Sequence, residues 1–138
     1  MAGELILIIE DNEKNLKLVR DLLQVKGYKT LEAETAELGI ELARRHTPHL
    51  ILMDIQLPGM DGVAARAQLK AEPITMQIPV IALTAFAMKD DQQRFLSAGF
   101  DGYLVKPIDI RELLRVVREV CDRYGPNPGP PAEEKQEP

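Results

Sequence analysis

The sequence has little of what secreted, membrane-spanning or nucleic-acid-binding proteins need. Cys121 is the single cysteine, which excludes an internal disulfide and a thiolate zinc cluster. No apolar run approaches the roughly 18 residues of a membrane span, and the N-terminus lacks the basic start and cleavage site of a secretory signal. The net charge is −5 and Lys and Arg do not cluster, so we expect no direct nucleic-acid binding. These absences predict a cytoplasmic protein with no membrane span.

Proline is concentrated at the C-terminal end, where residues 125–138 hold five of the ten prolines. This acidic segment has no apolar periodicity, and we predict a disordered tail because it cannot bury enough surface to offset its ordering entropy. Residues 1–124 then form one domain, which can bury about two-thirds of its unfolded surface without disulfides or a metal. We expect no second globular domain, such as a DNA-binding domain, in these 138 residues.

Short apolar runs alternate with amphipathic stretches along the first 124 residues. Four runs are apolar on both faces and a fifth alternates more, as is typical of strands in a parallel sheet covered on both sides. In chain order these are residues 5–9, 28–33, 50–53, 80–83 and 103–105. The helical patterns between them cover residues 16–23, 35–46, 62–71, 88–97 and 110–121. The stretch at 88–97 is much more polar than the others, and we expect a helix with a thin apolar stripe.

This alternation predicts an α/β fold. Right-handed crossovers give a doubly wound, five-stranded parallel sheet with helices on both faces. Numbered along the chain, the expected strand order is the flavodoxin-like 2-1-3-4-5, in which ligands bind outside the carboxyl ends of the strands. The residues that follow or end the strands at that edge are Glu10, Asp11, Asp54, Thr84, Ala85, Lys106 and Pro107.

Three carboxylates at one edge predict a metal site. Glu10, Asp11 and Asp54 would repel one another, and one would be protonated unless a cation is present. A hard divalent ion with oxygen ligands suits this set, and Mg²⁺ suits it better than zinc because His46 and His49 lie at the opposite end of the third strand.

Asp54 differs from the other two acids because it follows a buried strand directly and precedes a loop. A carboxylate held beside a metal can attack phosphorus and form an acyl phosphate. Lys106 and Thr84 could contact the other phosphoryl oxygens. A cis peptide bond at Pro107 would turn Lys106 toward the site.

These residues resemble the receiver domain of two-component response regulators (the CheY-like family) over about residues 4–123. The resemblance rests on the pair Glu10-Asp11, the MDIQLPGMDG segment around Asp54, the LTAFAM segment and Lys106-Pro107. Within the family the chain is most similar to stand-alone, single-domain regulators of the DivK type.

The resemblance implies a role for each residue. Asp54 would accept a phosphoryl group from a phosphohistidine of a sensor histidine kinase or a phosphotransfer protein, and the chain would not be an enzyme beyond this self-catalysed transfer and a slow autodephosphorylation. Mg²⁺ would be held by Glu10, Asp11, Asp54 and the backbone carbonyl of Gln56. Glu10 stands where many receivers have Asp, which leaves direct and water-mediated ligation both open.

The same resemblance implies a switch. Thr84 and Lys106 would bind the phosphoryl oxygens together with the Ala85 N–H, and Tyr103 would turn inward as Thr84 moves. The polar helix at 88–97 would be the bistable element, because few apolar contacts would oppose its movement. The output surface would be this helix with the fifth strand and the last helix, which would bind a downstream protein. A phosphorylation-linked homodimer is also open.

Three other functions share parts of this pattern. A haloacid-dehalogenase-type phosphatase needs an acid two residues after the nucleophile, and that position holds Gln56. A flavodoxin-like FMN binder expects a hydroxyl- and glycine-rich loop after the first strand, where EDNE would repel phosphate. The strongest rival is an adaptor that signals without phosphorylation.

Overall fold

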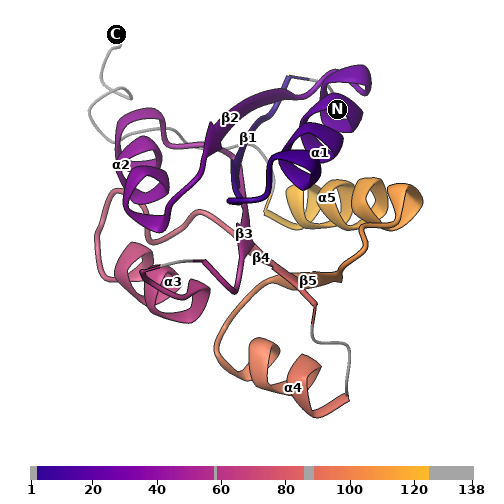
Figure 1. Ribbon diagram of the computed structural model, residues 1–138. Helices are drawn as coiled ribbons and strands as arrows, with labels where there is room; N and C mark the ends of the chain where they lie inside the picture. Colours follow the sequence, from indigo (N-terminus) through magenta and orange to yellow (C-terminus); the bar gives the residue numbers. More distant parts are fainter. Residues whose placement is uncertain (1–2, 58, 86–88, 125–138) are drawn as a thin grey trace, which may run out of the picture.

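Five parallel strands form one sheet in the order β2-β1-β3-β4-β5, as the sequence predicted (Figure 1). The computed structural model describes residues 3–57, 59–85 and 89–124. The strands are β1 (Leu5–Ile9), β2 (Lys29–Ala33), β3 (Leu50–Asp54), β4 (Val80–Thr84) and β5 (Gly102–Val105). The helices between them are α1 (Glu13–Val25), α2 (Ala36–His46), α3 (Gly62–Lys70), α4 (Lys89–Ser97) and α5 (Ile110–Tyr124).

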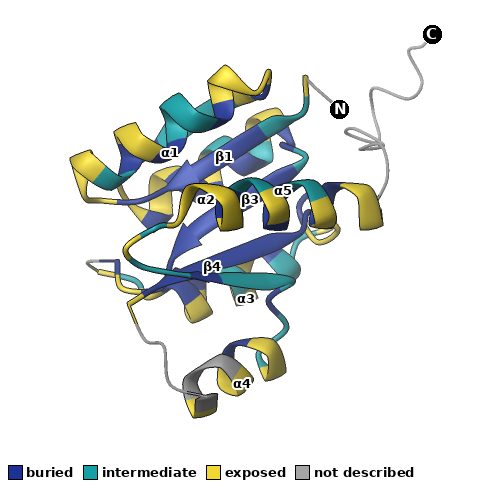
Figure 2. Cartoon of the chain, turned by 90° about the vertical axis from the view of Figure 1, so that its right-hand side faces the viewer, coloured by how far each residue is buried: buried dark blue, intermediate teal, exposed yellow. Residues whose placement is uncertain are grey.

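The helices form two layers, one on each face of the sheet. Side chains of α1 and α5 pack with one set of strand residues, and side chains of α2, α3 and α4 pack with the other set. Along β1, Ile6 and Ile8 face the first layer, and Leu7 and Ile9 face the second; all four are fully buried. This burial on both faces explains the continuous apolar runs in the sequence (Figure 2).

Two strands extend one residue further than the apolar runs. Asp54 pairs with Leu83 in the β3–β4 ladder, and Thr84 pairs with Val105 in the β4–β5 ladder. The backbone hydrogen bonds of the sheet therefore reach the two residues expected to carry chemistry. Their Cα positions are set by the sheet and not by a loop.

The helix ends differ slightly from the sequence patterns. Thr35 is the N-cap of α2 and not its first helical residue, since its side chain accepts the N–H of Leu38. Asp109 accepts the N–H of Glu112 at the start of α5, but the Glu112 carboxylate pairs with Arg115 and does not complete the capping box.

Some predictions fall on residues that the structure does not describe. The predicted disordered tail at 125–138 and the first residue of the predicted helix at 88–97 lie outside the described residues. Within the described ranges, no helix is long and apolar enough to cross a membrane.

His49 precedes β3 and is hydrogen-bonded to Leu5, the first residue of β1, at the end of the sheet opposite Asp54. Its Nδ1 accepts the N–H of Leu5 at 3.0 Å, and its own N–H donates to the Leu5 carbonyl at 2.8 Å. Burial lowers the pKa of His49 below its ordinary value, although the nearby Glu4 carboxylate acts in the opposite direction. The neutral imidazole is therefore the form that the folded state favours.

We expect this hydrogen bond to make stability depend on pH. The unfolded state takes up the proton more readily, so the contribution of His49 is complete above the unfolded pKa of about 6.5 and is lost as pH falls through the folded pKa. Between pH 7.5 and 5, the free energy of unfolding of wild type should fall by roughly 1 kcal/mol more than that of His49→Gln. Urea denaturation followed by circular dichroism measures this, with exposed His46→Gln as control. Equal losses in wild type and His49→Gln would contradict it.

Candidate functional site

The carboxyl ends of four neighbouring strands bring the predicted site residues together. Glu10 follows β1, Asp54 ends β3, Thr84 ends β4 and Lys106 follows β5. Three of these four residues are almost completely buried: Glu10 is 1 %, Asp54 3 % and Thr84 0 % exposed. The side chains therefore meet in a low-dielectric setting in which charges interact strongly.

Lys106 lies between two of the carboxylates. Its Nζ donates a hydrogen bond to Asp54 Oδ2 at 3.0 Å and lies 2.9 Å from Glu10 Oε1. The ammonium group is mostly shielded from solvent, with the side chain 19 % exposed. One cation thus joins the ends of β1, β3 and β5.

The backbone fixes the remaining carboxylate oxygens. The N–H of Asn12 donates to Glu10 Oε2 at 3.0 Å, and the N–H of Gln56 donates to Asp54 Oδ1 at 2.9 Å. Asn12 is also the N-cap of α1, where its side chain accepts the N–H of Asn15. Each buried carboxylate is therefore held from two sides, by the backbone of its own loop and by Lys106.

The protonation of Glu10 and Lys106 reflects this arrangement. Burial raises the pKa of Glu10 above its ordinary value, and the neighbouring Asp54 charge raises it further, against the opposing effects of Asn12 N–H and Lys106. Burial acts to lower the pKa of Lys106, but the contacts with Glu10 and Asp54 outweigh it, so this pKa lies above its ordinary value. Lys106 is therefore a stable cation in the site.

Thr84 connects the site to β5 through the backbone. Its carbonyl accepts the N–H of Lys106 at 2.8 Å, and its side chain is fully buried. Ala85, which follows, is exposed. The Lys106-Pro107 peptide bond is cis, the isomer expected to turn Lys106 toward the site.

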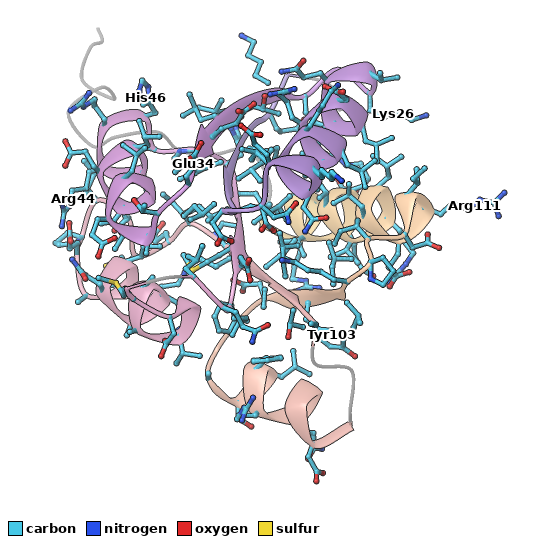
Figure 3. The ribbon with its side chains drawn as sticks, viewed as in Figure 1. Lys26, Glu34, Arg44, His46, Tyr103 and Arg111 are labelled. Carbon is cyan, nitrogen blue, oxygen red and sulfur yellow. The ribbon has the colours of Figure 1, made fainter. Side chains whose placement is uncertain are left out.

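The other two predicted residues lie at the margin of the site. Gln56 is exposed beside Asp54 in the loop after β3. Tyr103 is half-buried on β5, between α4 and α5 (Figure 3), and packs against the core on the α4 side of the sheet. It also lines a groove with Val105, Arg111 and Arg115.

The donor set fits a hard divalent cation. Glu10, Asp11 and Asp54 each offer a carboxylate oxygen, and these oxygens lie within 4.8 Å of one another. Asp11 is exposed, which leaves the cluster open to solvent on one side. Glu10 Oε1 is buried and receives no aligned hydrogen bond from the described residues, although Lys106 is near. Three carboxylates and one ammonium leave two negative charges, which Mg²⁺ would neutralise.

Two residues of the site were not identified from the sequence. Asn12 could have been found from its place before an amphipathic run, where Asn is a common N-cap. Gly62 had no local signal. A Cβ at Gly62 would lie 2.8 Å from the Ile55 Cα and 2.9 Å from the Asp54 carbonyl oxygen, so the first turn of α3 approaches the Asp54 backbone at a distance that only glycine allows.

The fold and this site define a class of signalling protein. The sequence matches the response regulator receiver domain over residues 6–118. The chain belongs to this family.

Relatives within the family are more specific. The chain is 43% identical to the polar-differentiation response regulator DivK of Brucella ovis over 113 residues, which cover 82% of this chain and 92% of the relative. The DivK of Brucella melitensis matches to the same extent. The chain is therefore a DivK-like receiver domain of the two-component type.

Solved structures agree with this assignment. The receiver domain of a sensor histidine kinase from Pseudomonas aeruginosa, which has a magnesium ion coordinated in its active-site cleft, is 34% identical with a TM-score of 0.80 and covers 88% of this chain and 99% of that one. A response regulator from Chloroflexus aurantiacus is 26% identical with a TM-score of 0.83, over 88% and 99% of the two chains.

We expect Mg²⁺ to stabilise the protein through the carboxylate cluster. Asp11→Asn removes one charged ligand and should weaken Mg²⁺ affinity by about tenfold or more, which lowers the stabilisation at a given Mg²⁺ concentration by about 1.4 kcal/mol. Thermal denaturation with and without MgCl₂ measures this, with exposed Glu119→Gln on α5 as control. If Asp11→Asn responded to Mg²⁺ as wild type does, the cluster would not be the metal site.

Gly62→Ala tests the close approach of α3 to Asp54. The added Cβ must push the start of α3 or the Asp54 backbone aside, and overpacking of this kind costs roughly 1–3 kcal/mol. Urea denaturation should show this loss in the free energy of unfolding. The stabilisation by MgCl₂ should also be smaller than in wild type, because Asp54 moves with its backbone. Exposed Ala67→Ser on the same helix is the control, and unchanged stability in Gly62→Ala would show that the loop relaxes freely.

Proposed function

We propose that the chain accepts a phosphoryl group on Asp54 from a phosphohistidine of a sensor histidine kinase or a phosphotransfer protein, in a Mg²⁺-dependent reaction. The observation that carries this proposal is the position of Lys106 Nζ, 3.0 Å from Asp54 Oδ2 and 2.9 Å from Glu10 Oε1, beside an open carboxylate cluster. Family membership and the likeness to DivK support it.

Asp54 is the nucleophile of this transfer. A carboxylate oxygen of Asp54 attacks phosphorus, the phosphorus–nitrogen bond to the donor histidine breaks, and the electron pair of that bond leaves with the imidazole, which then takes up a proton. Rigid placement favours the attack, since Asp54 is the last residue of a strand that is buried at every position.

The chain's own residues place the charges that this transfer requires. Glu10, Asp11, Asp54 and the backbone carbonyl of Gln56 would hold Mg²⁺, which when bound would neutralise charge on the transferring group. Lys106 leaves its contact with the Asp54 carboxylate and binds a phosphoryl oxygen. The Thr84 hydroxyl and the Ala85 N–H bind the others.

The phosphorylated protein signals through contacts of its own surface. The acyl phosphate brings about two negative charges to Asp54, and Thr84 and Lys106 gain new partners. Tyr103 turns inward as Thr84 moves, which changes the face formed by α4, β5 and α5. The groove between β5 and α5, lined in part by Tyr103, Arg111 and Arg115, supports this face as the site for a downstream protein.

Incubation with Mg²⁺ and acetyl phosphate, followed by intact-mass analysis, tests the proposal. Wild type should gain the mass of one phosphoryl group, and Asp54→Asn should gain none because the amide is a poor nucleophile. Asp122→Asn, on an exposed part of α5, is the matched control and should be labelled like wild type.

The same experiment separates the proposal from its rival. No gain of mass in wild type, with acetyl phosphate or with a cognate kinase, would favour an adaptor that signals without phosphorylation. Labelling of Asp54→Asn equal to that of wild type would place the phosphoacceptor elsewhere.

A further inference from the structure

Helix α4 lies at the edge of the domain formed by β5. Figure 1 shows it below the sheet, joined to β5, and Figure 2 shows its outer face exposed. Among the described side chains of α4, Phe95 is buried, with 1 % exposure, whereas Asp90, Gln93 and Leu96 are exposed. Of the α4 side chains that the structure describes, the aromatic ring of Phe95, near the C-terminal end, is the one that packs into the core.

The C-terminal end of α4 is closed by a regular capping motif. Gly99 has φ +96°, its N–H donates to the Leu96 carbonyl at 2.9 Å, and the N–H of Phe100 donates to the Phe95 carbonyl at 3.2 Å. This is the pair of hydrogen bonds of a Schellman motif. The rings of Phe95 and Phe100 meet edge to face, with centroids 6.3 Å apart.

Arg66 of α3 covers this cap from the neighbouring helix. Its guanidinium carbon lies 5.8 Å from the centroid of the Phe100 ring, in cation–π geometry. The group also packs against Gly99 so closely that a Cβ there would collide with it. Arg66 Nε is buried without a hydrogen-bond partner among the described residues. Stacking on Phe100 and packing against Gly99 are the contacts that place the guanidinium at the cap.

The chain that follows the cap is fixed to the sheet. The N–H of Asp101 donates to the Val80 carbonyl at 2.8 Å, and the N–H of Val80 donates to Asp101 Oδ2 at 2.8 Å. Val80 begins β4, and Thr84 ends β4 at the candidate site. The cap of α4 is thus tied to the end of β4 that lies away from the site.

We propose that Arg66 is a positioning residue that anchors the C-terminal end of α4, so that the helix pivots about the Phe95–Phe100 pair when Thr84 and Lys106 change partners. The pivot rests on the proposed function, since phosphorylation at Asp54 supplies the displacement. The movement begins at the site, near Thr84. Arg66 holds the C-terminal cap of α4 in place, so that the cap does not move with it. The N-terminal half of α4 then carries the change in the output face.

Hydrogen exchange of individual amides tests the anchor in the unliganded protein. Arg66→Met keeps the apolar stem and removes the guanidinium, and it should speed exchange of the Gly99 and Phe100 amides by about tenfold relative to the core amides of β1. Arg45→Met, on an exposed position of α2, is the matched control. Arg66→Lys keeps the charge without the planar group and should restore part of the protection. A change of less than twofold in Arg66→Met would overturn the anchor.

Beryllofluoride with Mg²⁺, a stable mimic of the phosphoryl group, tests the pivot. In wild type, exchange should change severalfold at residues 90–94 and less than twofold at residues 98–100. In Arg66→Met the change should extend through residue 100, while labelling of Asp54 by acetyl phosphate stays within twofold of wild type. An equal change in exchange at residues 90–94 and 98–100 of wild type would overturn the pivot. If exchange in Arg66→Met were faster at all amides, Arg66 would stabilise the whole domain and not the cap in particular, which would overturn the anchor.

The two proposals fail in different ways. If wild type shows no beryllofluoride response and no acetyl phosphate labelling, the proposed function and the pivot both fall. Hydrogen exchange of the Gly99 and Phe100 amides, compared between unliganded wild type and Arg66→Met, still decides whether Arg66 anchors the cap. If wild type is labelled but responds equally at both ends of α4, the function stands and the pivot falls.

Discussion

The position of the Lys106 ammonium between two buried carboxylates is the constraint on which the site depends. It lies 2.9 Å from an oxygen of Glu10 and 3.0 Å from an oxygen of Asp54, and so ties the end of β5 to the ends of β1 and β3. Without a cation, two nearly fully buried carboxylates would repel each other strongly enough to favour protonation of one of them. The ammonium offsets one of the three negative charges, and the cluster retains two negative charges for a divalent ion.

The sheet supplies the rigidity that this arrangement of charges needs. Every residue of β3 is buried, so Asp54 cannot shift without disturbing helices on both faces of the sheet. Gly62 brings the first turn of α3 against the Asp54 backbone and limits movement from a further side. The core therefore holds Asp54 in place, and the loops after the strands supply the hydrogen bonds that orient the buried carboxylates.

The two ends of the sheet have different roles. At one end, His49 and Asp101 use side-chain hydrogen bonds to start strands, and these contacts are built for stability. At the other end, Glu10, Asp54 and Lys106 carry charge, and the proposed phosphorylation would change their partners. Helix α4 lies beside β5, with its cap covered by Arg66 and its outer face exposed. A helix held at one end can respond to the site without loosening the core.

Local patterns were enough to predict the strand order, the two helical layers and the groups that gather at the carboxyl edge, because burial on both faces of a parallel strand leaves a continuous apolar run. They could not show that Lys106 reaches Glu10 as well as Asp54, that Gly62 touches the Asp54 backbone, or that Arg66 covers the cap of α4. The contacts of Lys106 and Arg66 join residues far apart in the chain, and that of Gly62 depends on how α3 packs beside β3. The sequence by itself determined which chemical groups reach the edge of the sheet. Only the tertiary structure decided which atoms meet, because such distances depend on how helices pack on the sheet, which no local period encodes.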